Sequence, residues 1–546
     1  MKAQNGGKRG LAVLGVLAAM GLGAPGAVCT AQSVTPTTTA TLEFAYLIAG
    51  DTVGGESLRI EANSVSGVLL MRGQPYISWT QKLVNGQPGS LTMDVGAPGG
   101  APGSTPQQHL VITPDGDGVV LEVAAGGRTQ RQVVPSKAGA MPLIGQSVLH
   151  AAVISRAMRL AGKSSAPLFL TSGGQTMDGS LSVSADTTSL SVAGLPVRVV
   201  WQGDQPLSAG VAPQQLKVVR VATPVRQPRL NYDAPAGAPY RAEQVSIPTA
   251  RGYSLAATLT IPDGSMPEMA ALASPDGRWP VAVTISGSGP QERDSGISIV
   301  PGYAPFREIA DTLGRRGVAV LRYDDRGVGE SGGADSRAAA TSADFADDVQ
   351  SVLSWLKTQS EVDSSRMLLI GHSEGGLIAP MVAVREPEVH AVVLLAGTAY
   401  NGRKILMYQN QQLIDSSKTS PAALDSINKQ LPRTLDSLAN TNAWLRYFMD
   451  TDPKPTIARV RQPVLILQGD SDHQVTPEQA DTITATLKRS GNTAVTLRHF
   501  PAVNHLFLND PDGRPAGYPT LPDARLSRSV LGALADWVAD TMRTVP

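Results

Sequence analysis

Apolar and polar residues alternate one by one through much of the region 41–222. Leu181 and Val183, for example, alternate with serines. A period of two is typical of strands that bury one face. Glycine- and proline-rich breaks such as 96–104 separate these runs, and one helical pattern lies around 143–160. The pattern predicts a β-rich N-terminal domain over 41–222 that is mainly antiparallel.

Prolines are concentrated in the next segment, 223–240, which contains four of them. Proline favours extended backbone and interrupts regular elements, so this composition is typical of a linker. We therefore place a domain boundary here.

Beyond the linker, short runs that are apolar throughout alternate with amphipathic helical patterns. Uniformly apolar strands separated by helices indicate a parallel sheet with helices on both faces. One helix should begin near Thr341 and Asp344, which have capping-box spacing. A hairpin is expected over 245–262, and the predicted strands are 281–285, 318–323, 367–370, 391–396, 464–467 and 495–500.

The sequence thus predicts an α/β domain over 241–546, with a helical cap inserted at 401–459 between two strands. In open parallel sheets, ligands bind at the carboxyl ends of the strands. The loops that follow residues 285, 323, 370, 467 and 500 are therefore the places to look for chemistry.

The first 31 residues have the layout of a secretory signal peptide. A basic start precedes the apolar stretch 11–28, and Ala31 is suited to be the last residue before cleavage. A membrane anchor is the alternative, but the stretch is short, rich in glycine and interrupted by Pro25. We expect an exported protein, periplasmic or secreted, with no membrane span in the mature chain.

The single cysteine, Cys29, lies at the end of this segment. Cleavage after Ala31 would remove it. Attachment of a lipid at Cys29 is the alternative, and the bulk of Val28 disfavours it. Either outcome excludes cysteine catalysis and thiolate metal sites.

Charge and composition narrow the choice of partner. Lysine plus arginine equals aspartate plus glutamate, 46 against 46, so the chain has no excess of positive charge that would favour nucleic acid. Apolar residues make up 42% of the chain, enough for a large core. A small-molecule substrate is the expected partner, and the oligomeric state stays open.

Two segments match the pattern G-x-S-x-G, centred on Ser331 and Ser373. Ser331 lies in a polar loop. Ser373 directly follows the predicted strand 367–370 and precedes an apolar helical run. A nucleophile elbow requires that strand-turn-helix setting, because a sharp turn lifts the hydroxyl out of the sheet edge. We predict that Ser373 is a nucleophile and that Ser331 is not.

A serine nucleophile needs a base, and a base needs an orienting carboxylate. Of the seven histidines, only His505 lies just beyond the last predicted strand, at a carboxyl-end loop. The loop after 464–467 offers Asp470 and Asp472. These positions predict a triad in which His505 is the base and one of the two aspartates is the acid.

Here the sequence resembles the α/β-hydrolase family, and in particular secreted bacterial serine esterases with a β-rich N-terminal domain. The pattern G-x-x-D-x-x-V at 469–475 is similar to the family's acid loop, in which the later aspartate, here Asp472, is the triad member. The order serine, acid, histidine also matches. The resemblance covers about 241–546. It implies an α/β-hydrolase fold with a helical cap insertion.

Two backbone N–H groups should stabilise the substrate oxyanion. The residue after the nucleophile, Glu374, should supply one. The resemblance suggests Ser288 as the other, with Gly289 as a second choice, in the glycine-rich loop 286–294. That loop lacks the lysine of a phosphate-binding loop, and Asp470 and Asp472 lack histidine partners at metal-site spacing. No cofactor and no metal are expected.

Two further segments resemble family features. The turn 323–331 resembles D-x-R-G-x-G-x-S and is interpreted as structural, with Asp325 and Arg326 pairing with nearby groups. In the cap, six large side chains could line an acyl pocket or could simply pack the cap against the domain. They are Met407, Tyr408, Trp444, Tyr447, Phe448 and Met449.

The function favoured by these observations is a serine carboxylesterase that works through an acyl-enzyme on Ser373. A serine aminopeptidase or an acyltransferase with the same triad, and a catalytically silent binding protein, are the alternatives.

Overall fold

The computed structural model describes residues 41–543, except 49–50, 73, 99–100, 126–127, 172–173, 193, 215, 227–229, 298–299, 301 and 413–419. The predicted signal peptide and Cys29 lie outside the described residues. The described chain divides into two compact units, and the boundary falls between Asn231 and Tyr232, inside the segment expected to be a linker.

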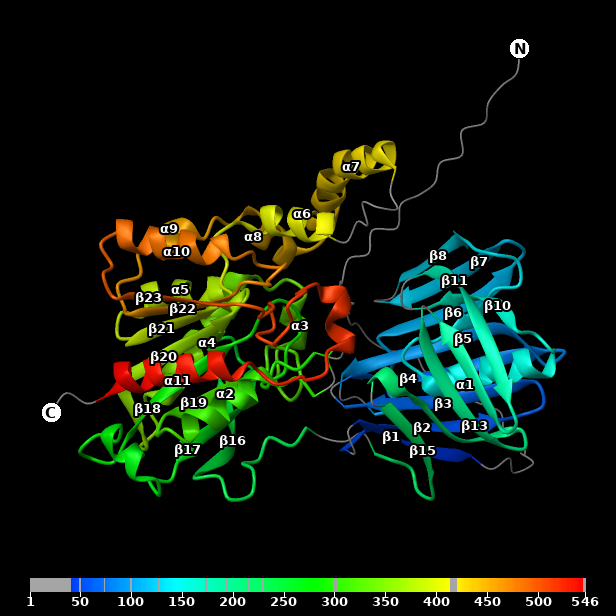
Figure 1. Ribbon diagram of the computed structural model, residues 1–546, viewed down its shortest axis with the longest axis horizontal. Coiled ribbons are helices and arrows are strands. Elements are labelled where there is room, and N and C mark those ends of the chain that lie inside the picture. The colour runs from blue at the N-terminus through cyan, green and yellow to red at the C-terminus, as the bar shows by residue number, and fades with distance from the viewer. Residues whose placement is uncertain are drawn as a thin grey trace, which may run out of the picture. The chain divides into compact units, whose positions relative to one another are not determined.

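The N-terminal unit is built on one sheet of fifteen strands among its described residues, in the order β8-β7-β6-β5-β4-β3-β2-β1-β15-β14-β13-β12-β11-β10-β9 (Figure 1). The strands are β1 Leu42–Ile48, β2 Asp51–Ile60, β3 Ser64–Met71, β4 Pro75–Val84, β5 Gln87–Pro98, β6 Gln108–Asp115, β7 Gly118–Ala125, β8 Arg128–Pro135, β9 Met141–Leu143, β10 Ser165–Leu170, β11 Gln175–Ser184, β12 Thr187–Val192, β13 Leu195–Gln202, β14 Gln205–Val211 and β15 Leu216–Val221.

Pairing in this sheet confirms the prediction of a mainly antiparallel domain. Neighbouring strands are antiparallel except for β9 and β10, which run parallel because helix α1 (Val148–Leu160) connects them. This helix matches the predicted helical pattern. Its apolar side chains, Leu149 and Ile154 among them, pack against strands from both halves of the sheet.

A buried acid connects the sheet to α1. Glu56 on β2 accepts hydrogen bonds from Tyr46, from Trp79 Nε1 (2.9 Å) and from Ser147 Oγ (2.6 Å). Ser147 also caps α1 by accepting from the His150 amide. Burial raises the pKa of Glu56, and the hydrogen bonds partly offset that rise.

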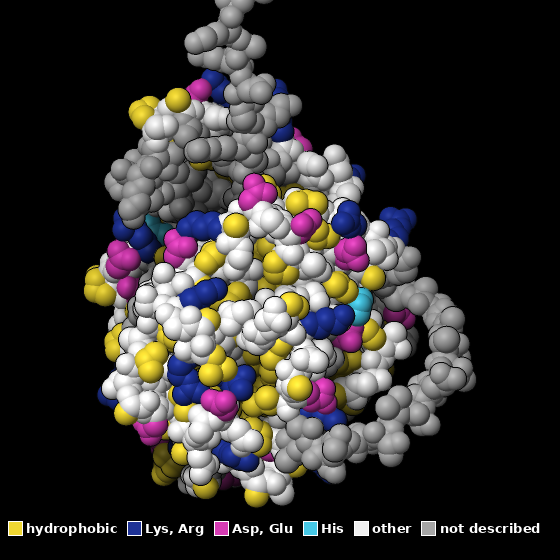
Figure 2. All heavy atoms as spheres, turned by 90° about the vertical axis from the view of Figure 1, so that its right-hand side faces the viewer, with side chains coloured by type: hydrophobic (Ala, Val, Ile, Leu, Met, Phe, Trp, Pro, Cys, Tyr) yellow, Lys and Arg dark blue, Asp and Glu magenta, His cyan; other side chains and the backbone are white. Residues whose placement is uncertain are grey.

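On the face shown in Figure 2, basic and acidic side chains are interspersed.

The second unit contains an eight-stranded sheet with the order β16-β17-β19-β18-β20-β21-β22-β23. The predicted hairpin is the antiparallel pair of β16 and β17, and β18 to β23 form the predicted parallel part. The strands are β16 Tyr240–Pro248, β17 Ser254–Pro262, β18 Trp279–Ile285, β19 Ala319–Tyr323, β20 Val362–His372, β21 Ala391–Leu395, β22 Val464–Gly469 and β23 Val495–Phe500.

Helices cover both faces of this sheet (Figure 1). On one face lie α4 (Ser342–Leu356), α5 (Gly375–Arg385) and α10 (Glu478–Arg489); on the other lie α2 (Pro305–Gly314) and α11 (Arg528–Met542). Thr341 and Asp344 form the predicted capping box of α4. The short α3 spans Ala334–Arg337.

The cap is helical, as expected. Its helices are α6 Gly402–Gln412, α7 Pro421–Ala439, α8 Ala443–Asp450 and α9 Lys454–Ile457. Within the described part of the chain, no helix is both long enough and apolar enough to cross a bilayer.

The two apolar faces explain why the buried central segments of the parallel strands are largely apolar. Along β20, Leu369 packs on the side of α4 and α5, whereas Leu368 and Ile370 pack on the side of α2 and α11. Both sets are fully buried. Because the strands are parallel, their carboxyl ends share one edge, and the loops that follow them meet there.

We expect Leu369→Ala to destabilise the second unit by about 2–5 kcal/mol, because it leaves a cavity in the centre of the sheet. Hydrogen exchange of peptides from β20 and β21 measures this unit separately from the N-terminal one. The control is Met266→Ala, at a side chain that is 38% exposed, with an expected change within about 0.5 kcal/mol. Equal effects of the two variants would contradict the assigned core.

Candidate active site

Ser373 occupies a strained turn between β20 and α5. Its φ is +54°, in the left-handed region that non-glycine residues rarely adopt. The Ser373 amide donates to the Leu395 carbonyl on β21 (2.9 Å), which fixes the turn to the sheet edge. A Cβ on Gly371 would lie 2.1 Å from the Gly375 carbonyl oxygen. The flanking glycines are therefore required by backbone contact, and the turn has the geometry of a nucleophile elbow.

His505 and Asp472 form a buried pair. The distance from His505 Nδ1 to Asp472 Oδ2 is 2.8 Å, and the side chains are 6% and 0% exposed. The other carboxylate oxygen of Asp472 accepts from the amides of Gln474 (2.8 Å) and Val475 (2.9 Å). The carboxylate is thus held in place by its own loop and presents one oxygen to the imidazole.

The structure also separates the two aspartates that the loop offered. Asp470 binds His499 Nδ1 at 2.8 Å, and both side chains are substantially exposed. Asp472, not Asp470, is the residue that contacts His505.

The histidine loop contacts the elbow through His372. His372 Nε2 lies 3.0 Å from the His505 carbonyl oxygen, and the two imidazole ring centroids are 5.0 Å apart. Since a carbonyl oxygen only accepts, Nε2 of His372 carries the hydrogen. Burial, together with the nearby His505, lowers the pKa of His372 to about 4, so this ring is neutral at pH 7.

The predicted triad is therefore brought to one sheet edge, but only one of its two hydrogen bonds is present. His505 is bonded to Asp472, whereas the hydrogen bonds of the described residues include none between the Ser373 hydroxyl and His505. In enzymes without substrate this bond is often long and shortens in the complex.

The two predicted oxyanion donors belong to segments that lie close to Ser373. Glu374 is buried at the N-terminus of α5, where the helix dipole is positive. Ser288 lies at the exposed tip of the loop after β18, and a Cβ on its neighbour Gly287 would be 3.3 Å from Ser373 Cβ. Among the hydrogen bonds of the described residues, neither the Ser288 nor the Glu374 amide has a protein acceptor. Both remain available to a substrate oxygen.

The side chain of Glu374 has contacts that the sequence analysis missed. Its carboxylate accepts from Ser342 Oγ on α4 (2.7 Å) and from Trp444 Nε1 in the cap (2.8 Å). Burial raises its pKa, and bonds with Ser342, Ser288 and Trp444 oppose that rise. An acid beside a predicted nucleophile was the signal available in the sequence.

The six large cap residues have different environments. Phe448 and Met449 are buried and pack inside the cap and against the domain. Trp444 is half-buried and stacks on Phe448, with ring centroids 5.4 Å apart. Tyr408 lies near Asp472, which contributes to a raised tyrosine pKa after the larger effect of burial. Trp444 and Tyr408 are thus cap residues that interact with site residues.

The serine of the other G-x-S-x-G motif, Ser331, is hydrogen-bonded to the backbone. Ser331 Oγ donates to the Asp324 carbonyl (2.7 Å) and accepts from the Ala256 amide (2.9 Å). Arg326 of the same turn pairs with Asp348 on α4 (2.7 Å). In the portion of the chain that is described, no group of three or more histidine, cysteine or acidic side chains could hold a metal ion.

Comparisons with known proteins agree with this architecture. A model of the prolyl oligopeptidase family matches residues 305–518. The esterase EstD of Thermotoga maritima is 25% identical over 286 residues, 51% of this chain and 64% of EstD. An uncharacterised Mycobacterium tuberculosis protein is 29% identical over 253 residues, 44% of this chain and 70% of that protein.

Two solved esterases are also similar. The Pyrococcus furiosus esterase Pf2001 has a TM-score of 0.38 at 17% identity. The match covers 58% of this chain and 95% of the Pf2001 chain. Est1E from Butyrivibrio proteoclasticus has a TM-score of 0.36 at 18% identity. The match covers 55% of this chain and 98% of Est1E.

The parallel sheet order, the helices on both faces and the strand-serine-helix turn give the second unit the α/β-hydrolase fold. This confirms the predicted fold class. The chain has the residue arrangement of a serine hydrolase, and it spans 64% of the length of EstD.

We expect Asp472→Asn to lower kcat on an activated ester by about 10³- to 10⁴-fold, because the imidazole loses the acceptor that fixes its tautomer. Asp470→Asn is the matched control on the same loop, and its kcat should stay within about threefold of the wild type, because Asp470 contacts only the exposed His499. A larger loss in the Asp470 variant would reverse the assignment.

Proposed function

We propose that the protein is a serine carboxylesterase that hydrolyses carboxylic esters through an acyl-enzyme on Ser373. The observation that carries the proposal is the buried bond between His505 and Asp472, on a loop that also contacts the elbow of Ser373. That bond leaves Nε2 of His505 as the free base, because Nδ1 donates its hydrogen to the carboxylate.

In the acylation step, the Ser373 hydroxyl attacks the ester carbonyl while His505 Nε2 takes its proton. The carbonyl oxygen becomes an oxyanion, which the Ser288 and Glu374 amides stabilise. The carbon–oxygen bond to the alcohol then breaks, and the protonated imidazole returns its proton to the leaving alcohol. The acyl group remains on Ser373.

In the deacylation step, His505 removes a proton from water, which attacks the acyl carbon. The bond to Ser373 Oγ breaks, the serine regains its proton from the imidazole, and a carboxylic acid leaves. An acyltransferase would differ only in using another acceptor in place of water.

The chief competing function is a serine peptidase, which the match to the prolyl oligopeptidase family favours. The similarity to EstD, which is named an esterase, supports ester hydrolysis. Both substrates would use the same triad, so the leaving group decides between them. Export to the periplasm or medium, predicted from residues 1–31, is part of the proposal, and a small-molecule ester is the proposed partner.

We expect Ser373→Ala to lose at least about 10³-fold in kcat on p-nitrophenyl butyrate, because no other hydroxyl occupies the elbow. Ser331→Ala, the variant of the other motif, should retain turnover, because Ser331 bonds only backbone groups.

The wild type should also react with a fluorophosphonate and should cleave an ester faster than the matching aminoacyl amide. A faster amide reaction would favour the peptidase. No labelling of the wild type would favour a silent binding protein.

The cap generates a second prediction, since Trp444 lies beside the elbow through its bond to Glu374. Removing the indole in Trp444→Ala should enlarge the acyl side of the site, so the ratio of kcat/KM for octanoate over butyrate esters should rise by about tenfold. The control is Met449→Ala, inside the cap's own apolar cluster. It should lower stability and leave the ratio unchanged; equal shifts in both variants would contradict the assignment.

A further inference from the structure

The loop that follows β18, residues 286–296, carries Ser288 at its tip and is fastened to the sheet at both ends. Ser286 Oγ donates to Asp325 Oδ1 (2.8 Å), and the Gln291 amide donates to Asp325 Oδ2 (3.1 Å). The Asp325 amide returns a bond to the Gln291 carbonyl (3.0 Å). One buried carboxylate therefore bridges the two sides of the tip 287–290.

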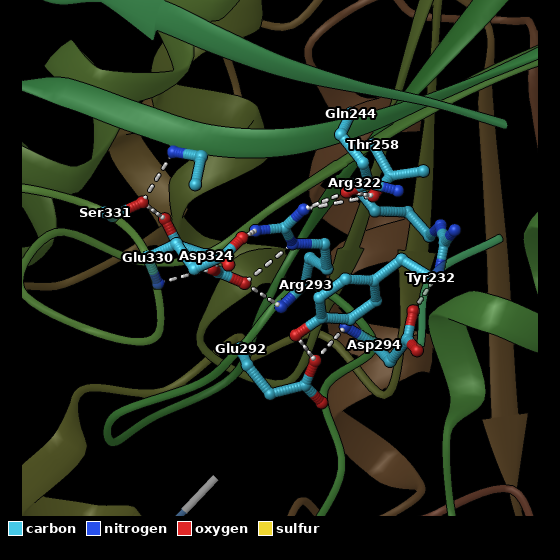
Figure 3. A network of polar contacts seen from close by, with 11 residues as sticks. Tyr232, Gln244, Thr258, Glu292, Arg293, Asp294, Arg322, Asp324, Glu330 and Ser331 are labelled. Carbon is cyan, nitrogen blue, oxygen red and sulfur yellow. Dashed lines mark hydrogen bonds and ion pairs between the residues drawn. The ribbon is translucent and has the colours of Figure 1, made fainter. Parts of the chain in front are cut away.

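A second carboxylate, that of Asp324, fastens the loop two residues further on (Figure 3). Asp324 Oδ1 accepts from the Arg293 amide (2.8 Å) and from Arg293 Nε (2.9 Å), and Oδ2 accepts from Arg293 Nη2 (2.8 Å). The two side chains are 1% and 0% exposed. A bidentate pair that also includes the backbone amide fixes both the side chain and the path of the loop.

The guanidinium of Arg293 has partners on each of its nitrogens. Nη1 donates to Gln244 (2.7 Å) and Thr258 (3.1 Å), on β16 and β17. Its Cζ lies 4.1 Å from the ring centroid of Tyr232. Figure 3 shows the two side chains together. The anchor is thus rigid, because the arginine cannot turn without leaving buried donors unpaired.

The end of the loop is closed by its own acid. Glu292 accepts from the amides of Asp294 (2.8 Å) and Gly296 (2.9 Å) and from the Tyr232 hydroxyl (3.1 Å). Asp294 in turn pairs with the buried Arg322 on β19. These contacts fix the base of the loop. At the exposed tip, which contains Gly287 and Gly289, Gln291 Nε2 donates to the Ser288 carbonyl (3.4 Å) and the Ser288 side chain bonds the Glu374 carboxylate.

Glycine-rich backbone loses much conformational freedom when it is ordered, so a tip such as 287–290 does not hold an amide in one direction by itself. Oxyanion stabilisation, however, requires donors that are already oriented before the reaction. The anchors at the base of the tip therefore contribute to the orientation of the Ser288 amide, together with the contacts of Ser288 itself.

We propose that Asp325, supported by Asp324, is a positioning residue of the reaction: its carboxylate holds both sides of the tip so that the Ser288 amide faces the substrate oxygen. The inference rests on the proposed function, since it assigns a role within that same site. It also gives a function to the tandem acids of the turn 323–331, which otherwise only close a loop.

A purely structural carboxylate would have a different setting. Asp348, on α4, pairs with Arg326 of the same turn and with Tyr253, and neither partner belongs to the loop 286–296. Asp325 has no hydrogen-bonded cation among the described residues; both its oxygens point to donors of that loop. Burial raises the pKa of Asp325 to about 7. A buried acid without a hydrogen-bonded cation costs stability, which favours a functional reason for it.

The test compares Asp325→Ala, Asp325→Asn and Ser286→Ala with Asp348→Ala as the control. Active sites are counted by fluorophosphonate labelling, so that kcat refers to folded enzyme only. Asp325→Ala should lose about 100-fold in kcat with KM within about threefold, because the amide is needed in the transition state more than in the ground state.

Asp325→Asn should recover most of the lost activity, since the amide oxygen can accept from Gln291 while its NH₂ donates to Ser286. Ser286→Ala, which removes one small hydroxyl, should lose a few-fold in kcat and fold normally. A trifluoromethyl ketone forms a tetrahedral adduct, and its Ki should rise in each variant in step with the loss of kcat.

Asp348→Ala should lower thermal stability and keep kcat per labelled site within about threefold of the wild type. The inference is overturned if Asp325→Ala keeps its kcat per labelled site, or if its loss equals that of Asp348→Ala. A wild-type enzyme that reacts with neither ester nor fluorophosphonate would instead overturn the proposed function, so the two failures are distinct.

Discussion

The register between β22 and β23 is the constraint on which the candidate site depends. Parallel pairing places Gly469 opposite Phe500, so the acid loop and the histidine loop leave the sheet side by side. The two loops approach so closely that a Cβ on Gly469 would lie 2.2 Å from the Val503 carbonyl oxygen. The hydrogen bond between Asp472 and His505 follows from that approach, although the residues are 33 positions apart.

Because the site depends on this register, the packing of the sheet also holds the triad residues in place. The strands below it are buried on both faces, so a shift of one strand would move apolar side chains as well as the triad. Polar groups at the sheet edge are buried but paired: Asp472 with two amides, Asp324 with Arg293, and Glu374 with Ser342 and Trp444. Without these partners, each buried polar group would carry an uncompensated desolvation free energy that lowers the stability of the fold.

Much of the fold could be predicted because period and composition change together at the linker. Most of the parallel strands are dominated by buried apolar residues, and the hairpin and the α4 capping box have local signals. Ser373, Asp472 and His505 could be selected because each follows a predicted strand, where chemistry is expected. The parallel pairing of β9 with β10 had no such signal, because it depends on where α1 returns the chain.

The contacts that could not be predicted from the sequence join residues of different helices, strands and loops. Arg326 pairs with Asp348 on α4, and the Glu374 carboxylate meets Trp444 from the cap, 70 positions away. Neither pair has a spacing that pattern reasoning recognises, since the partners meet only after the sheet and helices have formed. The role of Asp325 is of the same kind, because its two donors lie on a loop 34 to 39 positions earlier.

The central claim is that Ser373 forms the covalent intermediate. The most direct measurement is peptide mapping by mass spectrometry after incubation with a slowly deacylating p-nitrophenyl carbamate. We predict one carbamoyl group per chain, attached to the hydroxyl of Ser373 in the peptide that contains this residue. A modification on Ser331, on another side chain, or on none while p-nitrophenol is still released, would contradict it.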